Sequence, residues 1–357
     1  MGCAVSTAIA VLVCKNKCSI DRLTSKMAFH PPSPPSYSLE PQPDGTAKLT
    51  FANREMQEGL DSLSRAAHVP AKVEVRLLRT RKQQTIPLFH FQCRGATQTL
   101  LWSHSNAMDC GEMFFFFLDL AIHLKVNVAA YDYSGYGAST GEPSESNANA
   151  DVTAVYEYLQ GTGVDVARNL VLYGQSIGSA PTLYLAARRK YETAGVVLHT
   201  PILSGLRFLI PPSTGFCSPG GCCSPVCVFA LCDPFPNIKR VRRVKVPVLL
   251  IHGTADQTVD CSHTYALYER VPAPHRREPY IVRGAGHETV VQADPDTFFL
   301  RLAAFLASLP ASGASDSSTV RAPAVQQLMP VPAVAYEGFF APAPAEKQIP
   351  TACASRA

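Results

Sequence analysis

The stretch Leu-Val-Leu-Tyr-Gly-Gln-Ser-Ile-Gly at residues 170–178 determines how the rest of the chain is interpreted. Four apolar residues typical of a buried strand lead into a Gly-x-Ser-x-Gly pattern, and a helix-length segment follows. Small residues two positions before and after the serine let a strand and a helix approach each other, so that the serine hydroxyl projects at the sheet edge. We therefore predict that Ser176 is a nucleophile and that the amide of Ile177 donates to an oxyanion.

Compact apolar runs recur on both sides of this turn and alternate with helix-length segments. The predicted strands are 73–78, 87–91, 99–102, 126–131, 170–173, 195–198, 246–251 and 279–282. The predicted helices are roughly 109–124, 146–160 and 177–190. This alternation indicates an α/β fold with a mainly parallel, doubly wound sheet and helices on both faces. In such a sheet, functional side chains gather where the strands end.

Two later segments supply partners for the serine. Asp256 lies just beyond the strand that ends at residue 251, with Asp260 as the competing acid. His287 lies on a glycine-rich loop after the last predicted strand, which fits the order serine, acid, histidine. His252 precedes a turn glycine, so we expect a structural hydrogen-bonding role for it, and we expect His263 on the surface.

Composition indicates one large globular domain with flanking segments. The 357 residues are 46% hydrophobic and 17% charged, and the net charge of +4 is too small to suggest nucleic-acid binding. We predict a lipid-anchor leader at 1–30, a Pro-containing linker and entry segment at 31–72, and the α/β domain at 73–309. A Pro-rich and Ala-rich stretch at 310–357 is typical of a disordered tail.

Several motifs together resemble the α/β-hydrolase domain-containing protein 17 family. They are Tyr-Asp-Tyr-Ser-Gly-Tyr-Gly at 131–137, the elbow at 173–178, His-Gly-Thr at 252–254 and Gly-Ala-Gly-His at 284–287. The likeness extends over roughly residues 26–307. It implies an α/β-hydrolase fold and a membrane-anchored serine hydrolase that removes palmitoyl groups from protein cysteines without a cofactor. By motif position, Ser176, Asp256 and His287 take the triad roles.

The chain departs from that family in three places. Ser105 stands where related hydrolases usually have glycine, in the loop from which the amide of Asn106 or Ala107 is expected to supply the second oxyanion donor. Losing one such donor lowers the rate by on the order of a hundredfold or more. Glu288 and the following threonine replace a usual Asn-Asp pair, and residues 213–232 form a Cys-rich insertion in the α/β domain.

The twelve cysteines are distributed unevenly, which argues against a secreted disulfide framework. Five of them lie between Cys217 and Cys232. Within this group, Cys223 and Cys227 have a spacing seen in zinc sites, but no second pair with histidine accompanies them. We therefore predict no metal site and a chain that lies in a reducing compartment.

The first six residues, Met-Gly-Cys-Ala-Val-Ser, match an N-myristoylation pattern at Gly2. Stable anchoring needs a second signal, and Cys3, Cys14 and Cys18 are candidate palmitoylation sites. The apolar run 4–14 is too short to span a membrane, because a spanning helix needs about 20 residues. We therefore expect a lipid-anchored protein on the cytoplasmic face of the plasma membrane or an endomembrane.

Three functions are compatible with these residues. The first is thioester hydrolysis on S-acylated membrane proteins, which would be the substrates and partners. The second is a lipid or small-ester carboxylesterase, since the same triad serves both reactions. The third is an inactive membrane-bound scaffold, for which Ser105 and the altered residues after His287 are the only support.

Overall fold

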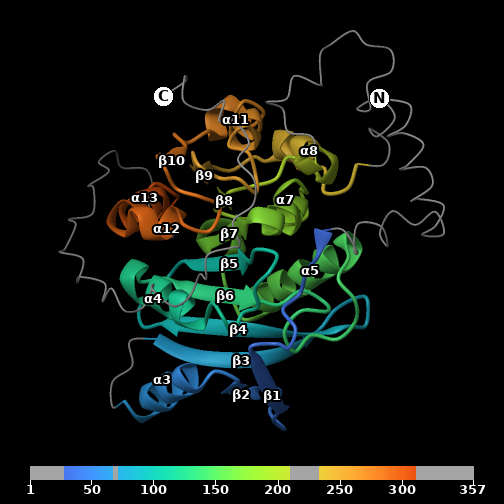
Figure 1. Ribbon diagram of the computed structural model, residues 1–357, viewed down its shortest axis with the longest axis vertical. Coiled ribbons are helices and arrows are strands. Elements are labelled where there is room, and N and C mark those ends of the chain that lie inside the picture. Colours follow the sequence, from blue (N-terminus) through green and yellow to red (C-terminus); the bar gives the residue numbers. More distant parts are fainter. Residues whose placement is uncertain (1–27, 67–70, 210–232, 311–357) are drawn as a thin grey trace.

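An eight-stranded sheet forms the centre of the molecule (Figure 1). The computed structural model describes residues 28–66, 71–209 and 233–310. The strand order is β10-β9-β8-β7-β5-β6-β4-β3, with parallel pairing from β10 to β6 and antiparallel pairing of β4 and β3. The strands are β3 (Ala71–Arg79), β4 (Thr85–Cys93), β5 (Thr99–Ser103), β6 (Asn127–Tyr131), β7 (Leu170–Gln175), β8 (Gly195–His199), β9 (Val248–Gly253) and β10 (Tyr280–Val282). The predicted mainly parallel sheet is confirmed.

Helices cover both faces of this sheet. In Figure 1, α4, α12 and α13 lie on one side of it, and α5 and α7 lie on the other. The helices are α3 (Arg54–Arg65), α4 (Phe114–Leu124), α5 (Glu145–Gly161), α6 (Val166–Asn169), α7 (Ser179–Ala186), α8 (Gly205–Leu209), α10 (Asn237–Arg240), α11 (Ser262–Tyr268), α12 (Val290–Ala293) and α13 (Pro295–Ala307). Short 3-10 turns are η1 (Ser176–Gly178), η3 (Val241–Arg243) and η4 (Ala273–His275).

Two helices are shorter than the sequence predicted. Residues 110–113 form turns rather than the first part of α4, because the Asp109 carboxylate accepts a hydrogen bond from the amide of Glu112 at 3.0 Å. Short polar side chains that bond to nearby amides in this way compete with helical hydrogen bonding. At the other helix, α7 ends at Ala186 and the chain turns through residues 187–190.

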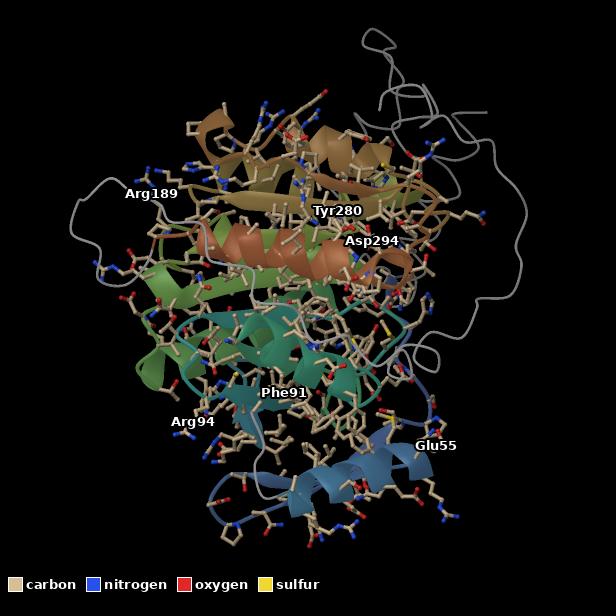
Figure 2. The ribbon with its side chains drawn as sticks, turned by 90° about the vertical axis from the view of Figure 1, so that its left-hand side faces the viewer. Glu55, Phe91, Arg94, Arg189, Tyr280 and Asp294 are labelled. Carbon is tan, nitrogen blue, oxygen red and sulfur yellow. The ribbon has the colours of Figure 1, made fainter. Side chains whose placement is uncertain are left out.

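The position of β7 in the sheet explains why its sequence is continuously apolar. Leu170 and Leu172 belong to the core cluster under α5, whereas Val171 and Tyr173 belong to the cluster under α4 and α13. Alternate residues of a strand point to opposite faces, and here both faces are covered. The ring of Tyr173 stacks on Trp102 of β5 with centroids 3.6 Å apart. Figure 2 shows the molecule from the side of α4 and α13, which lie in front of the sheet, with the side chains drawn as sticks.

The range 31–72 is more than a linker. It contains an antiparallel hairpin of β1 (Tyr37–Pro41) and β2 (Ala47–Phe51), followed by α3. Asn53 caps α3 by accepting hydrogen bonds from two amides of the first turn, and half-buried apolar residues pack its inner side on the core. Gly59 of α3 allows a close approach, because a Cβ there would lie 2.7 Å from the ring of Phe115.

Three predicted features lie outside the described residues. They are the lipidation sites Gly2, Cys3, Cys14 and Cys18, the insertion at 213–232, and the tail beyond residue 310. Within the part of the chain that the structure describes, no helix has the length and apolar character needed to cross a membrane.

Helix α13 offers a matched test of the core. Leu302 is 0% exposed and Leu300 is 45% exposed on the same helix. We expect Leu302→Ala to lower the free energy of unfolding by about 2–5 kcal/mol, because it leaves a cavity, and Leu300→Ala to change it by less than about 0.5 kcal/mol. Urea unfolding measures both, and equal losses would contradict the packing of α13 on the sheet.

Candidate active site

The elbow after β7 places Ser176 in a strained backbone conformation, with φ of +52°. Gly174 and Gly178, on either side of Ser176, are required because neighbouring atoms leave no room for a side chain. A Cβ on Gly174 would lie 2.5 Å from Thr182 Oγ1, and a Cβ on Gly178 would lie 2.1 Å from the carbonyl oxygen of Ser103. No side chain fits at either position, so the predicted steric role of the two glycines is what the structure shows.

Three side chains from three different loops meet at this elbow. His287, which follows β10, places Nε2 2.9 Å from Oγ of Ser176 and Nδ1 2.7 Å from Oδ2 of Asp256. Asp256 follows β9, as the sequence predicted. The competing acid Asp260 lies apart from this group and accepts a hydrogen bond from the amide of Ser262 at the start of α11. The structure therefore brings together Ser176, Asp256 and His287.

Asp256 is held from several directions. Its Oδ1 accepts hydrogen bonds from the amides of Thr258 and Val259 at 2.9 and 2.8 Å. Its Oδ2 lies 3.0 Å from Nε2 of His252 as well as 2.7 Å from His287. Burial alone would raise the pKa of Asp256, but the hydrogen bonds from His252 and His287 hold that pKa far below its usual value. The carboxylate is therefore charged at neutral pH.

The tautomer of His252 follows from its partners. Its Nε2 faces two acceptors, Asp256 and the carbonyl of Val259, whereas its Nδ1 lies 2.7 Å from the hydroxyl of Thr264. Nε2 therefore carries the proton, and the expected structural role of His252 is to orient Asp256. The expectation for His263 was wrong: it is fully buried, accepts from the amide of Leu203, and burial lowers its pKa to about 4.

Glu288 lies beside His287 and Gln175, a position that the sequence did not predict. Its Oε2 accepts a hydrogen bond from Nε2 of Gln175 at 3.2 Å, and its Oε1 lies 3.8 Å from Nε2 of His287. Its side chain is 36% exposed, against 9% for His287. Burial acts to lower the pKa of His287, but Asp256 and then Glu288 raise it, and the net shift is upward. The one sequence feature that could have indicated this position is the glutamate at residue 288, where the family usually has a different residue.

The predicted oxyanion donors lie on two segments in contact. The first is Ile177 in η1, and the second is the loop after β5, residues 104–110, here called the oxyanion loop, which contains Asn106 and Ala107. The approach of Gly178 to the carbonyls of Ser103 and His104 joins the two segments. Ser105 is buried without a positive φ, so the backbone does not require glycine there, and its hydroxyl has no partner among the described residues.

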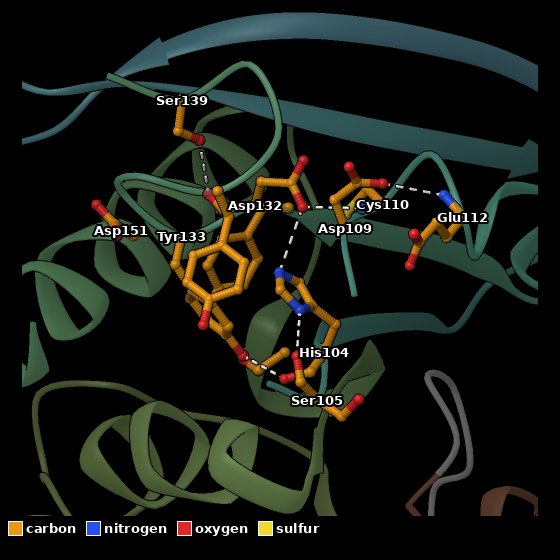
Figure 3. Close-up of polar contacts among 12 residues, drawn as sticks. His104, Ser105, Asp109, Cys110, Glu112, Asp132, Tyr133, Ser139 and Asp151 are labelled. Atoms are coloured by element: carbon orange, nitrogen blue, oxygen red, sulfur yellow. Dashed lines mark hydrogen bonds and ion pairs between the residues drawn. The ribbon is translucent and has the colours of Figure 1, made fainter. Parts of the chain in front are cut away.

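A buried cluster supports the oxyanion loop (Figure 3). His104 Nε2 lies 3.3 Å from Oδ1 of Asp132, which also accepts from the amide of Cys110 at 2.8 Å. The donor atoms of His104, Cys110 and Asp132 lie within 4.8 Å of one another, a spacing that could hold a metal ion. Asp132 also accepts from the hydroxyl of Tyr37, so its two oxygens already have three partners. An ion would have to displace one of these contacts.

Comparison with known proteins identifies relatives of the chain. No family model matches it. The α/β-hydrolase domain-containing protein aho-3 of Caenorhabditis elegans is 40% identical over 277 residues, covering 75% of this chain and 73% of that protein. The α/β-hydrolase domain-containing protein 17B of Homo sapiens is 38% identical, covering 75% of this chain and 86% of its own. Protein 17C of Xenopus laevis is 37% identical, covering 75% and 85%.

Solved structures agree at the level of the fold. An esterase of Pyrococcus furiosus has a TM-score of 0.54 at 18% identity and covers 69% of this chain and 92% of its own. A membrane phospholipase A, a bacterial virulence factor, has a TM-score of 0.50 at 16% identity, covering 70% and 89%. The chain therefore has the α/β-hydrolase fold and belongs to the α/β-hydrolase domain-containing protein 17 family.

Proposed function

We propose that this chain is a serine hydrolase that cleaves acyl thioesters, with palmitoyl-cysteine on membrane-associated proteins as the principal substrate. The observation that carries the proposal is the position of His287, which lies 2.9 Å from Ser176 and 2.7 Å from Asp256. An imidazole between a hydroxyl and a carboxylate can remove the proton of the hydroxyl, and the carboxylate stabilises the imidazolium that forms.

The reaction follows from this geometry in two halves. Ser176 Oγ attacks the thioester carbonyl while His287 Nε2 accepts its proton, and the amides of Ile177 and of Asn106 or Ala107 stabilise the oxyanion. The carbon–sulfur bond then breaks, and the imidazolium returns the proton to the cysteine sulfur. Water, deprotonated by His287, then attacks the acyl-enzyme, the bond between Ser176 Oγ and the acyl carbon breaks, and the imidazolium returns the proton to Ser176 Oγ as the fatty acid leaves. No cofactor takes part in this reaction.

Membership of the family and the leader pattern support a palmitoyl thioester on a membrane protein as the substrate. Lipids on Gly2 and on Cys3, Cys14 or Cys18 would hold the enzyme at the cytoplasmic face of a membrane, where S-acylated proteins are found. A carboxylesterase acting on lipids or small esters is the second candidate, because the same three side chains serve ester hydrolysis and the similar solved structures include an esterase.

The first prediction from the proposed function concerns the nucleophile. Ser176→Ala should abolish labelling by a fluorophosphonate probe and lower the release of palmitate from a membrane-bound acyl-protein by at least about a thousandfold. Ser64→Ala on the exposed side of α3 serves as the control and should behave as wild type.

The outcomes separate the candidate functions. Labelling without palmitate release, with turnover of neutral esters, would favour the carboxylesterase. A wild-type protein that never labels would favour an inactive scaffold, in which the triad geometry is retained without catalysis.

The second prediction concerns pH. His287 must be neutral to accept the proton of Ser176, so activity should rise with pH through a pKa above the ordinary value of 6.5. The charged or titratable groups that act on His287 are Asp256, Glu288 and the buried His199. Glu288→Gln removes a negative charge 3.8 Å from Nε2. The imidazolium then becomes less stable, which lowers the pKa of His287 and moves the acid limb of kcat/KM to lower pH.

The size of this shift should be about half to one pH unit, given the exposure of Glu288. The pH profile of kcat/KM with a soluble thioester measures it. Glu55→Gln, on the exposed side of α3, is the control and should leave the profile unchanged. An acid limb at the same pH in both variants would show that Glu288 does not act on the base.

The third prediction concerns the leader. Gly2→Ala combined with Cys3→Ser removes the predicted myristoylation site and the neighbouring candidate palmitoylation site. Because stable anchoring takes two lipid signals, this double variant should move the protein from the membrane fraction to the soluble fraction. Cys93→Ser, a free cysteine within the α/β domain, is the matched control and should stay with the membrane. Unchanged membrane association of the double variant would rule out an anchor that depends on Gly2 and Cys3.

A further inference from the structure

We propose that residues 28–37, here called the N-terminal strap, position the oxyanion loop, and that His30, Ser36 and Tyr37 are positioning residues for the hydrolysis. The inference rests on the proposed function, because it concerns the loop that supplies the second oxyanion donor. The strap leads from the N-terminal leader into β1 and contacts the oxyanion loop at three separate points.

The first contact holds Asn106. The amide of His30 donates to Asn106 Oδ1 at 2.9 Å, and the hydroxyl of Tyr136 donates to the same oxygen at 2.7 Å. The side chain of Asn106 is therefore held from two sides. Because Asn106 and Ala107 are the expected oxyanion donors, this contact acts directly on the segment whose amides must point at the substrate.

Phe29 fixes this end of the strap on the domain. Its ring is 6% exposed and packs edge to face against Tyr133, Tyr136 and Phe235, with centroid distances of 6.4, 6.2 and 5.8 Å. Aromatic pairs in this arrangement contribute beyond the area they bury. The amide of His30, next in the chain, is thereby held in place opposite Asn106.

The second contact holds Asp109. The amide of Ser36 donates to Asp109 Oδ2 at 2.8 Å, and the hydroxyl of Ser36 donates to Oδ1. Asp109 is fully buried, so these bonds satisfy a carboxyl group that has left water. The approach of the two segments is close, because a Cβ on Gly111 would lie 2.3 Å from Ser36 Oγ. The strap therefore also contacts the far end of the oxyanion loop.

The third contact passes through Asp132. The hydroxyl of Tyr37 donates to Oδ2 of Asp132. Oδ1 of the same carboxylate accepts a hydrogen bond from the amide of Cys110 and lies 3.3 Å from Nε2 of His104 (Figure 3). One carboxylate thus connects the strap to the first and the last residue of the oxyanion loop. Burial, followed by the charge of Asp132, raises the pKa of Tyr37, so its hydroxyl keeps the proton that it donates.

His104 makes two hydrogen bonds, one through its ring and one through its backbone carbonyl. Its Nδ1 lies 2.7 Å from the carbonyl of Ser105, and its own carbonyl accepts from the hydroxyl of Tyr133 at 2.6 Å. Nε2 of His104 has no hydrogen-bond partner among the described residues and lies 3.3 Å from Oδ1 of Asp132. The Asp132 carboxylate therefore lies against the ring of His104 at the start of the loop, and Tyr37 helps to fix that carboxylate.

These contacts give the strap a specific kinetic effect. Oxyanion donors act mainly in the transition state, so a loop that shifts should lower kcat and leave KM nearly unchanged. A misplacement of about 1 Å can cost on the order of a hundredfold in rate. Removing one hydroxyl from the strap should therefore lower kcat by about ten- to a hundredfold.

The test uses the full-length protein with Tyr37→Phe and Ser36→Ala, assayed for kcat, KM and fluorophosphonate labelling rate. Tyr156→Phe is the matched control, because Tyr156 is also buried and its hydroxyl donates to the carbonyl of Glu192, outside the oxyanion loop. We expect kcat and the labelling rate to fall together in both strap variants and not in the control. Hydrogen exchange of the amides at 104–110 should become faster in the same variants.

The double variant Tyr37→Phe with His104→Gln tests the route through Asp132. If Tyr37 acts through that carboxylate, the double variant should be little slower than His104→Gln alone.

Other results would overturn the inference. These are labelling rates and exchange at 104–110 equal to those of the control, a rise in KM with unchanged kcat, or a loss of activity fully explained by unfolding at the assay temperature. A wild-type protein that never labels at Ser176 would overturn the proposed function itself, which distinguishes that failure from failure of the strap variants alone.

Discussion

The contact between the backbone of Gly178 and the carbonyl oxygens of Ser103 and His104 is the constraint on which the site depends. A Cβ at this position would lie 2.1 Å from the first of these oxygens, so the elbow can approach β5 only through a glycine. The parallel pairing of Ser103 with Gly174 places the ends of β5 and β7 side by side. The serine, the amide of the next residue and the oxyanion loop consequently meet at one edge of the sheet.

Two buried carboxylates with imidazole partners organise this edge. Asp256 accepts from His252, His287 and two amides, and Asp132 holds His104, Tyr37 and the amide of Cys110. Burying a carboxylate is costly unless hydrogen bonds replace the lost water, and both groups have that replacement. Asp256 orients His287 and Asp132 supports the loop opposite it, so the two halves of the site are fixed by the same kind of interaction.

The sequence was informative where local patterns reflect packing. The apolar run of β7 has both faces buried, and the glycines around Ser176 are required by contacts within the elbow, so strand and elbow could be predicted together. The order of Asp256 and His287 after later strands followed from the position of the strand ends. In α3 no residue is fully buried, and the strands of the hairpin before it are short, so neither gave a clear pattern.

Contacts between distant segments could not be read in this way. Tyr37 meets Asp132 across 95 positions, and Gln175 meets Glu288 across 113. Nothing local to either residue indicates its partner. The burial of His263 was missed for the same reason, because it accepts from Leu203, 60 positions away. Such pairs form only when distant strands and loops pack together, and local sequence patterns do not indicate which segments will meet.

The strap also has a consequence for limited proteolysis. A protease that cuts before Ala28 leaves every contact described between the strap and the oxyanion loop in place. A cut between His30 and Ser36 separates the bond to Asn106 from the bonds to Asp109 and Asp132. Cleavage before Ala28 and cleavage between His30 and Ser36 therefore differ in how much support they leave for the oxyanion loop, although fewer than ten residues of chain separate the two positions.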